Sequence, residues 1–210
     1  KKITKIVLNT KNSVNIAIIG KYVNLKDAYK SLDEALVHGG IANNIKVNLI
    51  RIESDNLKNN EIKTKLKNVS GLLIPGGFGR RGTHGKISAI KYARENKIPF
   101  LGICFGMQMA IIEFARNRLK IKNAGSSELD RRCYPVIGLI NEWDKNGKII
   151  KGTDKNLGGT MRLGLYEANL INNSAINKIY KLRNIKERHR HRYEVNNSLR
   201  DKFENKGLIF

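Results

Sequence analysis

The first 117 residues alternate between short apolar runs and longer amphipathic segments. The apolar runs have the length and composition of strands that are buried on both faces of a sheet. These strands are predicted over residues 14–20, 47–52, 71–77 and 98–103.

The segments between these runs carry apolar residues at intervals of three and four, as the buried face of a helix does. Gly39 and Gly40 are expected to end the first helix, because glycine is common just past a helix C-terminus. The helices are predicted over residues 27–38, 61–66, 86–96 and 107–117.

Alternating strands and helices predict right-handed crossovers, and therefore an α/β fold with a mostly parallel open sheet flanked by helices on both faces. Residues 14–210 are expected to form the domain, preceded by a polar, lysine-rich linker over residues 1–13. Beyond about residue 120 the pattern loosens. Strands are predicted over residues 134–140 and 164–170, a helix over 175–182, and a mobile polar loop over 141–159.

Composition limits the classes of function. The chain has 210 residues, a formal net charge of +22 and 40% hydrophobic residues. No apolar run approaches the roughly 20 residues that cross a bilayer, and the start lacks the apolar core of a signal peptide, so a cytoplasmic protein is expected. Lysine and asparagine are enriched throughout, without a zinc-finger, helix-turn-helix or base-stacking motif. We therefore expect neither a nucleic-acid partner nor a membrane.

The two cysteines have different contexts. They form no CxxC pair, so neither a disulfide framework nor a metal site is expected. Cys133 precedes an apolar run and is expected to pack as a small, half-buried residue.

Cys104 lies in the pattern G-x-C-x-G, residues 102–106, between a predicted strand and a predicted helix. This is the form of a nucleophile elbow, in which small neighbours permit a sharp, strained turn. At the start of a helix, free N–H groups and the macrodipole favour a thiolate. The alternative is a buried cysteine between two glycines that allow close packing.

A second glycine-rich turn, Pro-Gly-Gly-Phe-Gly at residues 75–79, follows another predicted strand. Its N–H groups, with that of Phe105, are suited to hold the oxyanion of a tetrahedral intermediate. Taken alone, the turn is equally consistent with a plain turn or a phosphate cradle, although it does not match the P-loop pattern.

Together, LGICFGMQ at residues 101–108 and PGGFG about 25 residues earlier closely resemble the class I, or triad, glutamine amidotransferases. Several further segments are similar to the glutaminase domain of the CTP synthase family. They are GKYV (20–23), DAYKS (27–31), PGGFGRRG (75–82), YAREN (92–96), GGTMRLG (158–164) and ERHRHRYEVN (187–196).

This resemblance implies a flavodoxin-like three-layer fold and hydrolysis of L-glutamine to supply ammonia. In that family the ammonia aminates UTP to CTP on a separate amidoligase domain that uses ATP and Mg. GTP is an allosteric activator there, and the whole enzyme is a homotetramer. For this domain itself the resemblance implies no cofactor and no metal, with the amidoligase domain of the same protein as its partner.

The resemblance also assigns roles to individual positions. It implies that Cys104 is the nucleophile, that Gly77 and Phe105 hold the oxyanion, and that Glu128 receives the α-amino group of glutamine. Phe105 stands where leucine is common in the family. The residues implied to line the glutamine site are Gly77, Phe105, Gly106, Met107, Gln108, Glu128 and Arg192.

The family's catalytic histidine and glutamate belong to a Phe-His-Pro-Glu motif downstream of residues 187–196. Residues through Phe210 contain no such motif, and the histidines, His38, His84, His189 and His191, lie in other contexts. We therefore expect a C-terminally incomplete domain whose base lies in residues that follow. The alternatives are another hydrolase with a cysteine elbow and a catalytically silent glutaminase-like module.

Overall fold

The computed structural model describes residues 3, 10–23, 25, 27–139, 142–145, 148–151 and 161–210, with the backbone alone for 142–145 and 148–151. They belong to two compact units, Lys1–Val136 with Asn196–Phe210, and Ile137–Val195. The predicted linker over residues 1–13 lies largely outside the described residues.

The first unit is built on a four-stranded sheet in the order β2-β1-β3-β4. All three pairings are parallel, with Ile16 of β1 opposite Leu49 of β2 on one side and Gly71 of β3 on the other. The mostly parallel sheet is therefore confirmed. Its strands are β1 (Ser13–Gly20), β2 (Lys46–Glu53), β3 (Gly71–Ile74) and β4 (Phe100–Gly102).

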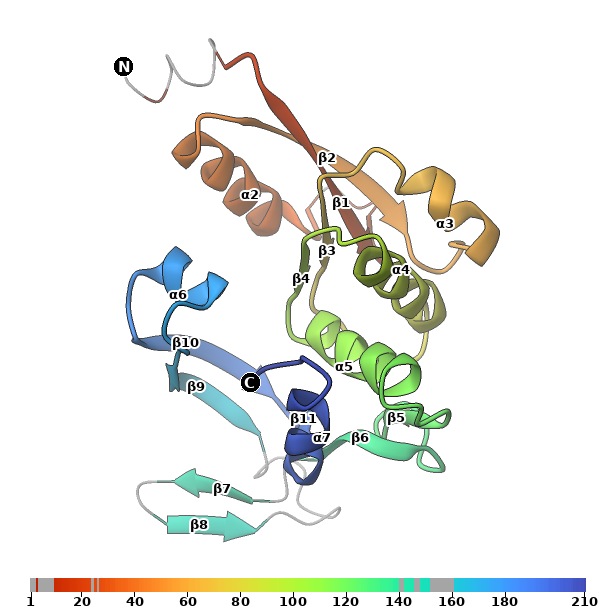
Figure 1. The fold of residues 1–210 in the computed structure, drawn as a ribbon, viewed down its shortest axis with the longest axis vertical. Coiled ribbons are helices and arrows are strands. Elements are labelled where there is room, and N and C mark those ends of the chain that lie inside the picture. The colour runs from red at the N-terminus through yellow and green to blue at the C-terminus, as the bar shows by residue number, and fades with distance from the viewer. Residues whose placement is uncertain are drawn as a thin grey trace. The chain divides into compact units, whose positions relative to one another are not determined.

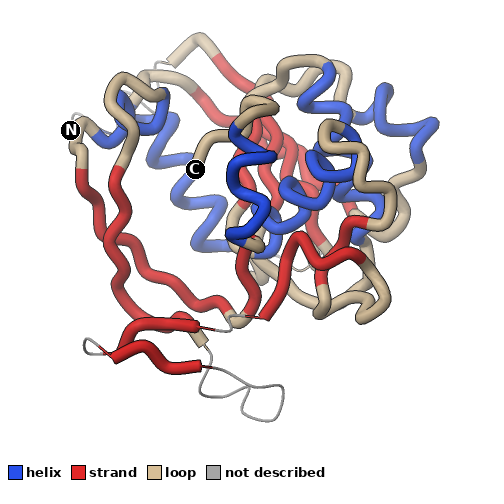
Figure 2. Tube along the Cα trace, turned by 60° about the horizontal axis from the view of Figure 1, so that its bottom comes forward, coloured by secondary structure: helices blue, strands red, loops and turns tan. Residues whose placement is uncertain are grey.

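Helices cover both faces of this sheet, as predicted. α2 connects β1 to β2 on one face, whereas α3, α4 and α5 lie on the other face (Figures 1 and 2). The face that each connecting helix covers follows from right-handed crossovers. The chain moves one way along the sheet from β1 to β2 and the other way from β2 to β4, so the helices of these connections lie on opposite faces. The bounds are α2 (Lys30–Ala42), α3 (Asn59–Lys65), α4 (Thr83–Glu95) and α5 (Phe105–Asn117).

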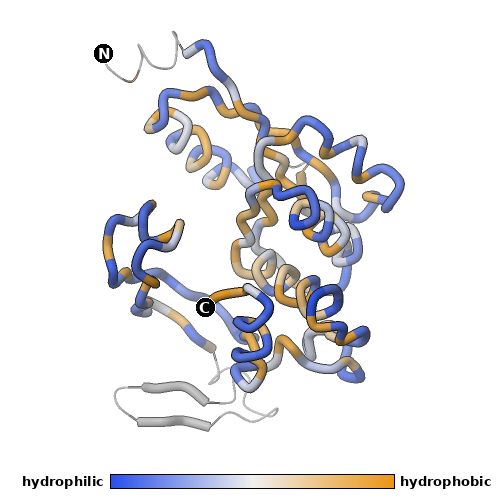
Figure 3. Tube along the Cα trace, viewed as in Figure 1, coloured by the Kyte–Doolittle hydropathy of each residue, from blue (hydrophilic) through white to orange (hydrophobic). Residues whose placement is uncertain are grey.

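The apolar residues of the central strands form the core between these layers. Ala17, Ile18, Ile19 and Ile74 are completely buried. Hydrophobic positions accordingly concentrate along the strands and the inner side of α5, whereas the outer turns are hydrophilic (Figure 3).

The end of the first helix was predicted wrongly. α2 continues through Gly39 and Gly40 to Ala42. A Cβ atom on Gly40 would lie 2.6 Å from the carbonyl oxygen of Ile45 and 2.7 Å from Val47. Gly40 is thus a close-packing position inside the helix rather than its end, because it lets the helix approach the start of β2.

An ion pair with a buried carboxylate joins α4 to α5. Nη2 and Nε of Arg94 donate to the two carboxylate oxygens of Glu113 at 2.8 and 3.0 Å, and the side chain of Glu113 is only 1% exposed. Such a bidentate pair fixes the relative orientation of its two helices. It therefore helps to orient α5, which begins directly after Cys104.

The C-terminal segment packs on the other end of the same helix. After the 3-10 turn η1 (Asn197–Leu199), α7 (Arg200–Glu204) buries Phe203 completely. The ring centroid of Phe203 lies 6.0 Å from that of Phe114 in α5.

Further strands lie beyond α5. β5 (Ala124–Ser126), β6 (Tyr134–Leu139) and β11 (Tyr193–Val195) form one sheet in the order β11-β6-β5, in which β11 and β6 are antiparallel. In the second unit β9 (Arg162–Asn169) pairs with β10 (Asn184–His191) in antiparallel orientation, and α6 (Ala175–Tyr180) lies between them in sequence.

The predicted mobile loop over residues 141–159 was wrong in part. β7 (Glu142–Lys145) and β8 (Lys148–Lys151) form a hairpin there, and the other positions of that loop are outside the described residues. Within the described ranges, none of the helices has the length and apolar character that crossing a membrane requires.

Candidate active site

Cys104 occupies the turn between β4 and α5, as the elbow pattern predicted. Its backbone has φ 54° and ψ −105°, a combination that lies outside the ordinary regions for any residue with a Cβ atom. Holding such a conformation costs on the order of 1–3 kcal/mol, and strain of this kind concentrates at functional sites.

Gly102 and Gly106, on either side of Cys104, lie too close to other backbone atoms to carry a side chain. A Cβ atom on Gly106 would lie 2.1 Å from the carbonyl oxygen of Ile74, and one on Gly102 would lie 2.6 Å from the amide nitrogen of Met107. Ile103 donates its N–H to the same carbonyl of Ile74 at 2.9 Å. The elbow is therefore pressed against the end of β3, where the glycine turn begins.

The glycine turn of residues 75–79 lies beside Cys104. A Cβ atom on Gly76 would be 3.6 Å from Cβ of Cys104, and one on Gly77 would be 3.9 Å from the ring of Phe105. Gly76 and Gly77 are exposed. The structure thus brings together the two backbone segments from which sequence reasoning composed an oxyanion hole.

The electrostatics of the thiol differ from the sequence expectation. Burial is the main cause that raises the pKa of Cys104, and the carboxylate of Glu128 raises it further. The N–H of Phe105 hydrogen-bonds to the sulfur and lowers this pKa. The start of the helix therefore favours the thiolate, as expected, but desolvation of the half-buried sulfur outweighs it. A partner that accepts the thiol proton is needed for reactivity at neutral pH.

Glu128 is placed at the same site. Its Oε1 accepts a hydrogen bond from the N–H of Gly79 at 3.2 Å, and its own N–H donates to the hydroxyl of Ser126 at 3.3 Å. A turn after β5 thus presents a carboxylate to the glycine turn, within electrostatic reach of Cys104.

Two lysines near the elbow were missed by sequence reasoning. The ammonium groups of Lys21 and Lys86 lie 5.8 and 5.3 Å from the ring centroid of Phe105, within the range of cation–π attraction. Lys86 is only 2% exposed, and its pKa falls to about 8, chiefly through burial. The sequence could have indicated the burial of Lys86, because its spacing from Ile90 and Ala93 places all three on one face of the helix.

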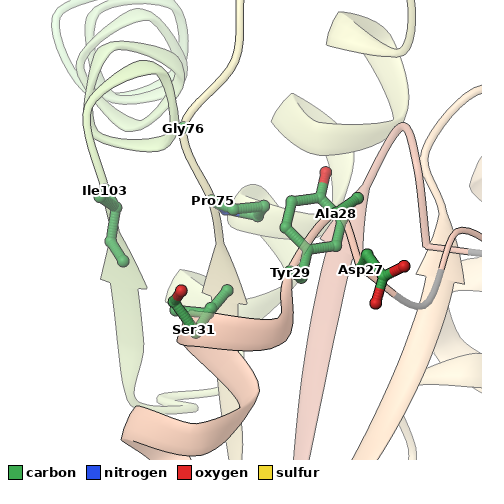
Figure 4. A pocket seen from close by; sticks show the side chains of 8 residues that line it. Asp27, Ala28, Tyr29, Ser31, Pro75, Gly76 and Ile103 are labelled. Carbon is green, nitrogen blue, oxygen red and sulfur yellow. The ribbon is translucent and has the colours of Figure 1, made fainter.

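A pocket of about 320 Å³ lies between the start of α2 and the turns that follow β3 and β4 (Figure 4). Gly76 borders both this pocket and Cys104. The lining residues are Asp27, Ala28, Tyr29, Ser31, Leu32, Pro75, Gly76 and Ile103.

The other predicted site residues lie in the first turn of α5 and in the second unit. Phe105, Gly106 and Gln108 are buried, and Met107 is half-buried. Phe105 can therefore contribute to an oxyanion site through its backbone. Arg192 belongs to the second unit, where it is half-buried.

Two other candidate reactive side chains have the exposure that the sequence predicts. His84 is exposed on the first turn of α4, as expected of a surface residue. Cys133 is half-buried, as predicted. The described part of the chain contains no cluster of three or more side chains suited to hold a metal ion.

Comparison with known families gives a match over most of the chain. The model of "Glutamine amidotransferase class-I" matches residues 24–210. The CTP synthase of Pelagibacter ubique is 74% identical over 210 residues, covering all of this chain and 39% of that protein. The CTP synthase of Zymomonas mobilis is 51% identical over 213 residues, again covering all of this chain and 39% of that protein.

A solved structure is similar as well. The glutaminase domain of Trypanosoma brucei CTPS with bound acivicin matches with a TM-score of 0.79 and 33% sequence identity. The match covers 92% of this chain and 72% of that one. The chain spans about 39% of the length of the curated relatives it matches.

Proposed function

This chain belongs to the class I glutamine amidotransferases, as a glutaminase domain of the CTP synthase family, and on that premise we propose that Cys104 is the nucleophile that attacks L-glutamine. The observation that carries the proposal is the strained backbone of Cys104, φ 54° and ψ −105°, directly before α5. The N–H of Phe105 that follows is directed at the sulfur. The turn places the half-buried sulfur at the carboxyl end of a parallel strand, where open α/β sheets bind their ligands.

In the proposed reaction the thiolate of Cys104 adds to the side-chain amide carbon of glutamine. The carbonyl oxygen becomes an oxyanion, which the N–H groups of Phe105 and the Gly77 segment stabilise. Collapse of this intermediate breaks the C–N bond, and the nitrogen leaves as ammonia after taking up one proton. Water then hydrolyses the resulting thioester, which releases glutamate and regenerates the thiol.

The proton exchange requires an acid–base group matched to the raised pKa of Cys104. The family resemblance assigns this role to the histidine of a Phe-His-Pro-Glu motif, supported by its glutamate. We propose that the whole protein supplies this pair.

Recognition of glutamine as a free amino acid requires partners for two charges. We assign the α-ammonium group to the carboxylate of Glu128, whose position is supported by its contact with Gly79. Arg192 is proposed as a donor at the same site. Met107 and the backbone around Gly106 are proposed to border the substrate with Gln108 behind them.

For the whole protein we propose that the released ammonia aminates UTP to CTP. An amidoligase domain of the whole protein would use ATP and Mg, and GTP would activate the glutaminase. The relatives' names support this proposal, as does the 39% of their length that the chain covers. A homotetramer in the cytoplasm is the proposed working state.

Labelling of the cysteines tests the nucleophile. A glutamine analogue with an electrophilic side chain, such as the acivicin found in the Trypanosoma brucei relative, is expected to modify Cys104 in the whole protein. Cys104→Ala should abolish both labelling and glutamine hydrolysis. Cys133→Ala is the matched control and should retain both. Equal labelling of the Cys104→Ala variant, or hydrolysis of peptides in preference to glutamine, would refute the proposal.

A further inference from the structure

Lys21 directly follows β1, and its ammonium group reaches the glycine turn of residues 75–79. Nζ donates hydrogen bonds to the carbonyl oxygen of Phe78 and, at 3.4 Å, to that of Gly79. An ammonium has three donors and no acceptor. By binding two successive carbonyl groups, it restricts how the peptide groups of the turn are rotated.

The peptide group between Phe78 and Gly79 is held from both sides. Its C=O accepts from Lys21, and its N–H donates to Oε1 of Glu128 at 3.2 Å. The C=O and N–H of a trans peptide point in opposite directions within one plane, so the two contacts together set that plane. Gly79 has φ +74°, a conformation that glycine adopts without steric cost. Lys21 therefore also determines where the turn meets the carboxylate of Glu128.

The same ammonium group also contacts the elbow. Nζ of Lys21 lies 5.8 Å from the ring centroid of Phe105 and 5.9 Å from that of Phe78, distances at which a cation is attracted to an aromatic face. Phe105 immediately follows Cys104 and contributes the N–H of the proposed oxyanion site. One charged group thus binds the backbone of the glycine turn and lies within cation–π range of the side chain that follows Cys104.

Lys21 is itself anchored. Arg81 donates to the carbonyl oxygen of Lys21 at 3.4 Å and pairs with Asp55 at 3.0 Å. Burial and then Arg81 lower the pKa of Lys21, and the carboxylates of Asp55 and Glu128 oppose them. Its backbone is thus fixed while two carboxylates favour the charged form.

We propose that Lys21 is a positioning residue of the glutaminase site. It fixes the position of the glycine turn relative to the elbow. The N–H groups of both segments then converge on the oxyanion, and Glu128 contacts the substrate. This inference rests on the function proposed above. Lys21 does not touch the reacting atoms; it acts through Phe78, Gly79 and Phe105.

The test compares two reactions of the same sulfur in the whole protein. Glutamine hydrolysis passes through an oxyanion, whereas alkylation of Cys104 by iodoacetamide displaces iodide from a saturated carbon and forms none. Lys21→Met keeps an unbranched apolar stem and removes the ammonium group. We expect its kcat for glutamine to fall by about 10²-fold, the loss typical of a disrupted oxyanion site, while the alkylation rate and melting temperature stay close to wild type.

Two companion variants sharpen the result. Lys21→Arg retains the charge and should recover part of the lost kcat. Lys65→Met removes an exposed lysine of α3 and should leave glutamine hydrolysis unchanged. The inference is wrong if Lys21→Met retains wild-type kcat, or if hydrolysis and alkylation fall together, since the latter would indicate general damage to the elbow.

Failure of this inference is distinguishable from failure of the proposed function. If wild-type protein hydrolyses glutamine, Cys104→Ala does not, and Lys21→Met does so normally, only the role of Lys21 is refuted. If Cys104→Ala still hydrolyses glutamine, the proposed function is refuted and this inference with it.

Discussion

The Cβ position of Gly106 lies 2.1 Å from the carbonyl oxygen of Ile74, so the first turn of α5 rests on the last residue of β3. This contact brings the elbow that carries Cys104 against the strand from which the glycine turn leaves. A side chain at Gly106 would have to push the helix away from the sheet, because the atom it meets belongs to the backbone.

We therefore expect Gly106→Ala to destabilise the protein by about 1–3 kcal/mol, the usual cost of overpacking a core. Urea unfolding measures this loss. Gly39→Ala is the matched control, since Gly39 also lies in a helix and nothing lies within 4 Å of its Cβ position. That substitution should stabilise by up to about 1 kcal/mol through helix propensity. Equal effects of the two substitutions would contradict the close approach.

Glu128→Gln tests recognition of the substrate's α-ammonium group. A hydrogen bond to a charged group contributes about 1.5–3 kcal/mol, so KM for glutamine should rise by about 10- to 100-fold, with a smaller change in kcat. Steady-state kinetics with glutamine separate the two parameters. Glu204→Gln, which alters a carboxylate that pairs with Arg200 within α7, serves as the control. An unchanged KM for Glu128→Gln would exclude the proposed contact.

The same substitution should also shift the titration of the thiol. The negative charge of Glu128 raises the pKa of Cys104, so its removal should move the midpoint of Cys104 alkylation to lower pH. Asp130→Asn provides a comparison within one molecule, because Asp130 acts instead on the pKa of Cys133. Mass spectrometry of the two alkylated peptides across a pH series gives both midpoints. A Cys104 midpoint that is unmoved by Glu128→Gln would place that carboxylate too far from the thiol.

Burial of Lys86 should make stability depend on pH. Its pKa is about 8 in the folded protein against an ordinary value of 10.5, so between these values the unfolded chain binds more protons. The free energy of unfolding should then rise with pH across that window, by up to about 3 kcal/mol. Lys21 and Arg81 lower this pKa, and Asp55 and Glu53 oppose them.

Lys86→Met should remove this rise and stabilise the protein at pH 7, because methionine is buried without desolvating a charge. Chemical unfolding at pH 7 and near pH 10 measures the difference between variant and wild type. Lys65→Met, at an exposed position, should show the wild-type dependence. A Lys86→Met variant that keeps the full rise would show that another group is responsible.

The sequence by itself determined the features that depend on near neighbours along the chain. Apolar runs specified the four parallel strands, and the glycines at 102 and 106 specified the turn that carries Cys104, because both signals are local. Helix ends were less well predicted: Gly40 has the residue type of a helix end, yet contact with Val47 makes it a packing position.

Only the tertiary structure decided how charges are distributed around Cys104. The helix start at Cys104 predicted a thiolate, but burial and Glu128 raise its pKa, and both depend on residues distant in sequence. Likewise, Lys21 contacts Phe78 and Phe105 only because β1 and β3 are adjacent in the sheet. Desolvation and Coulomb interactions depend on distances through space, so spacing along the chain predicted the turn at Cys104 but not the charged groups that surround it.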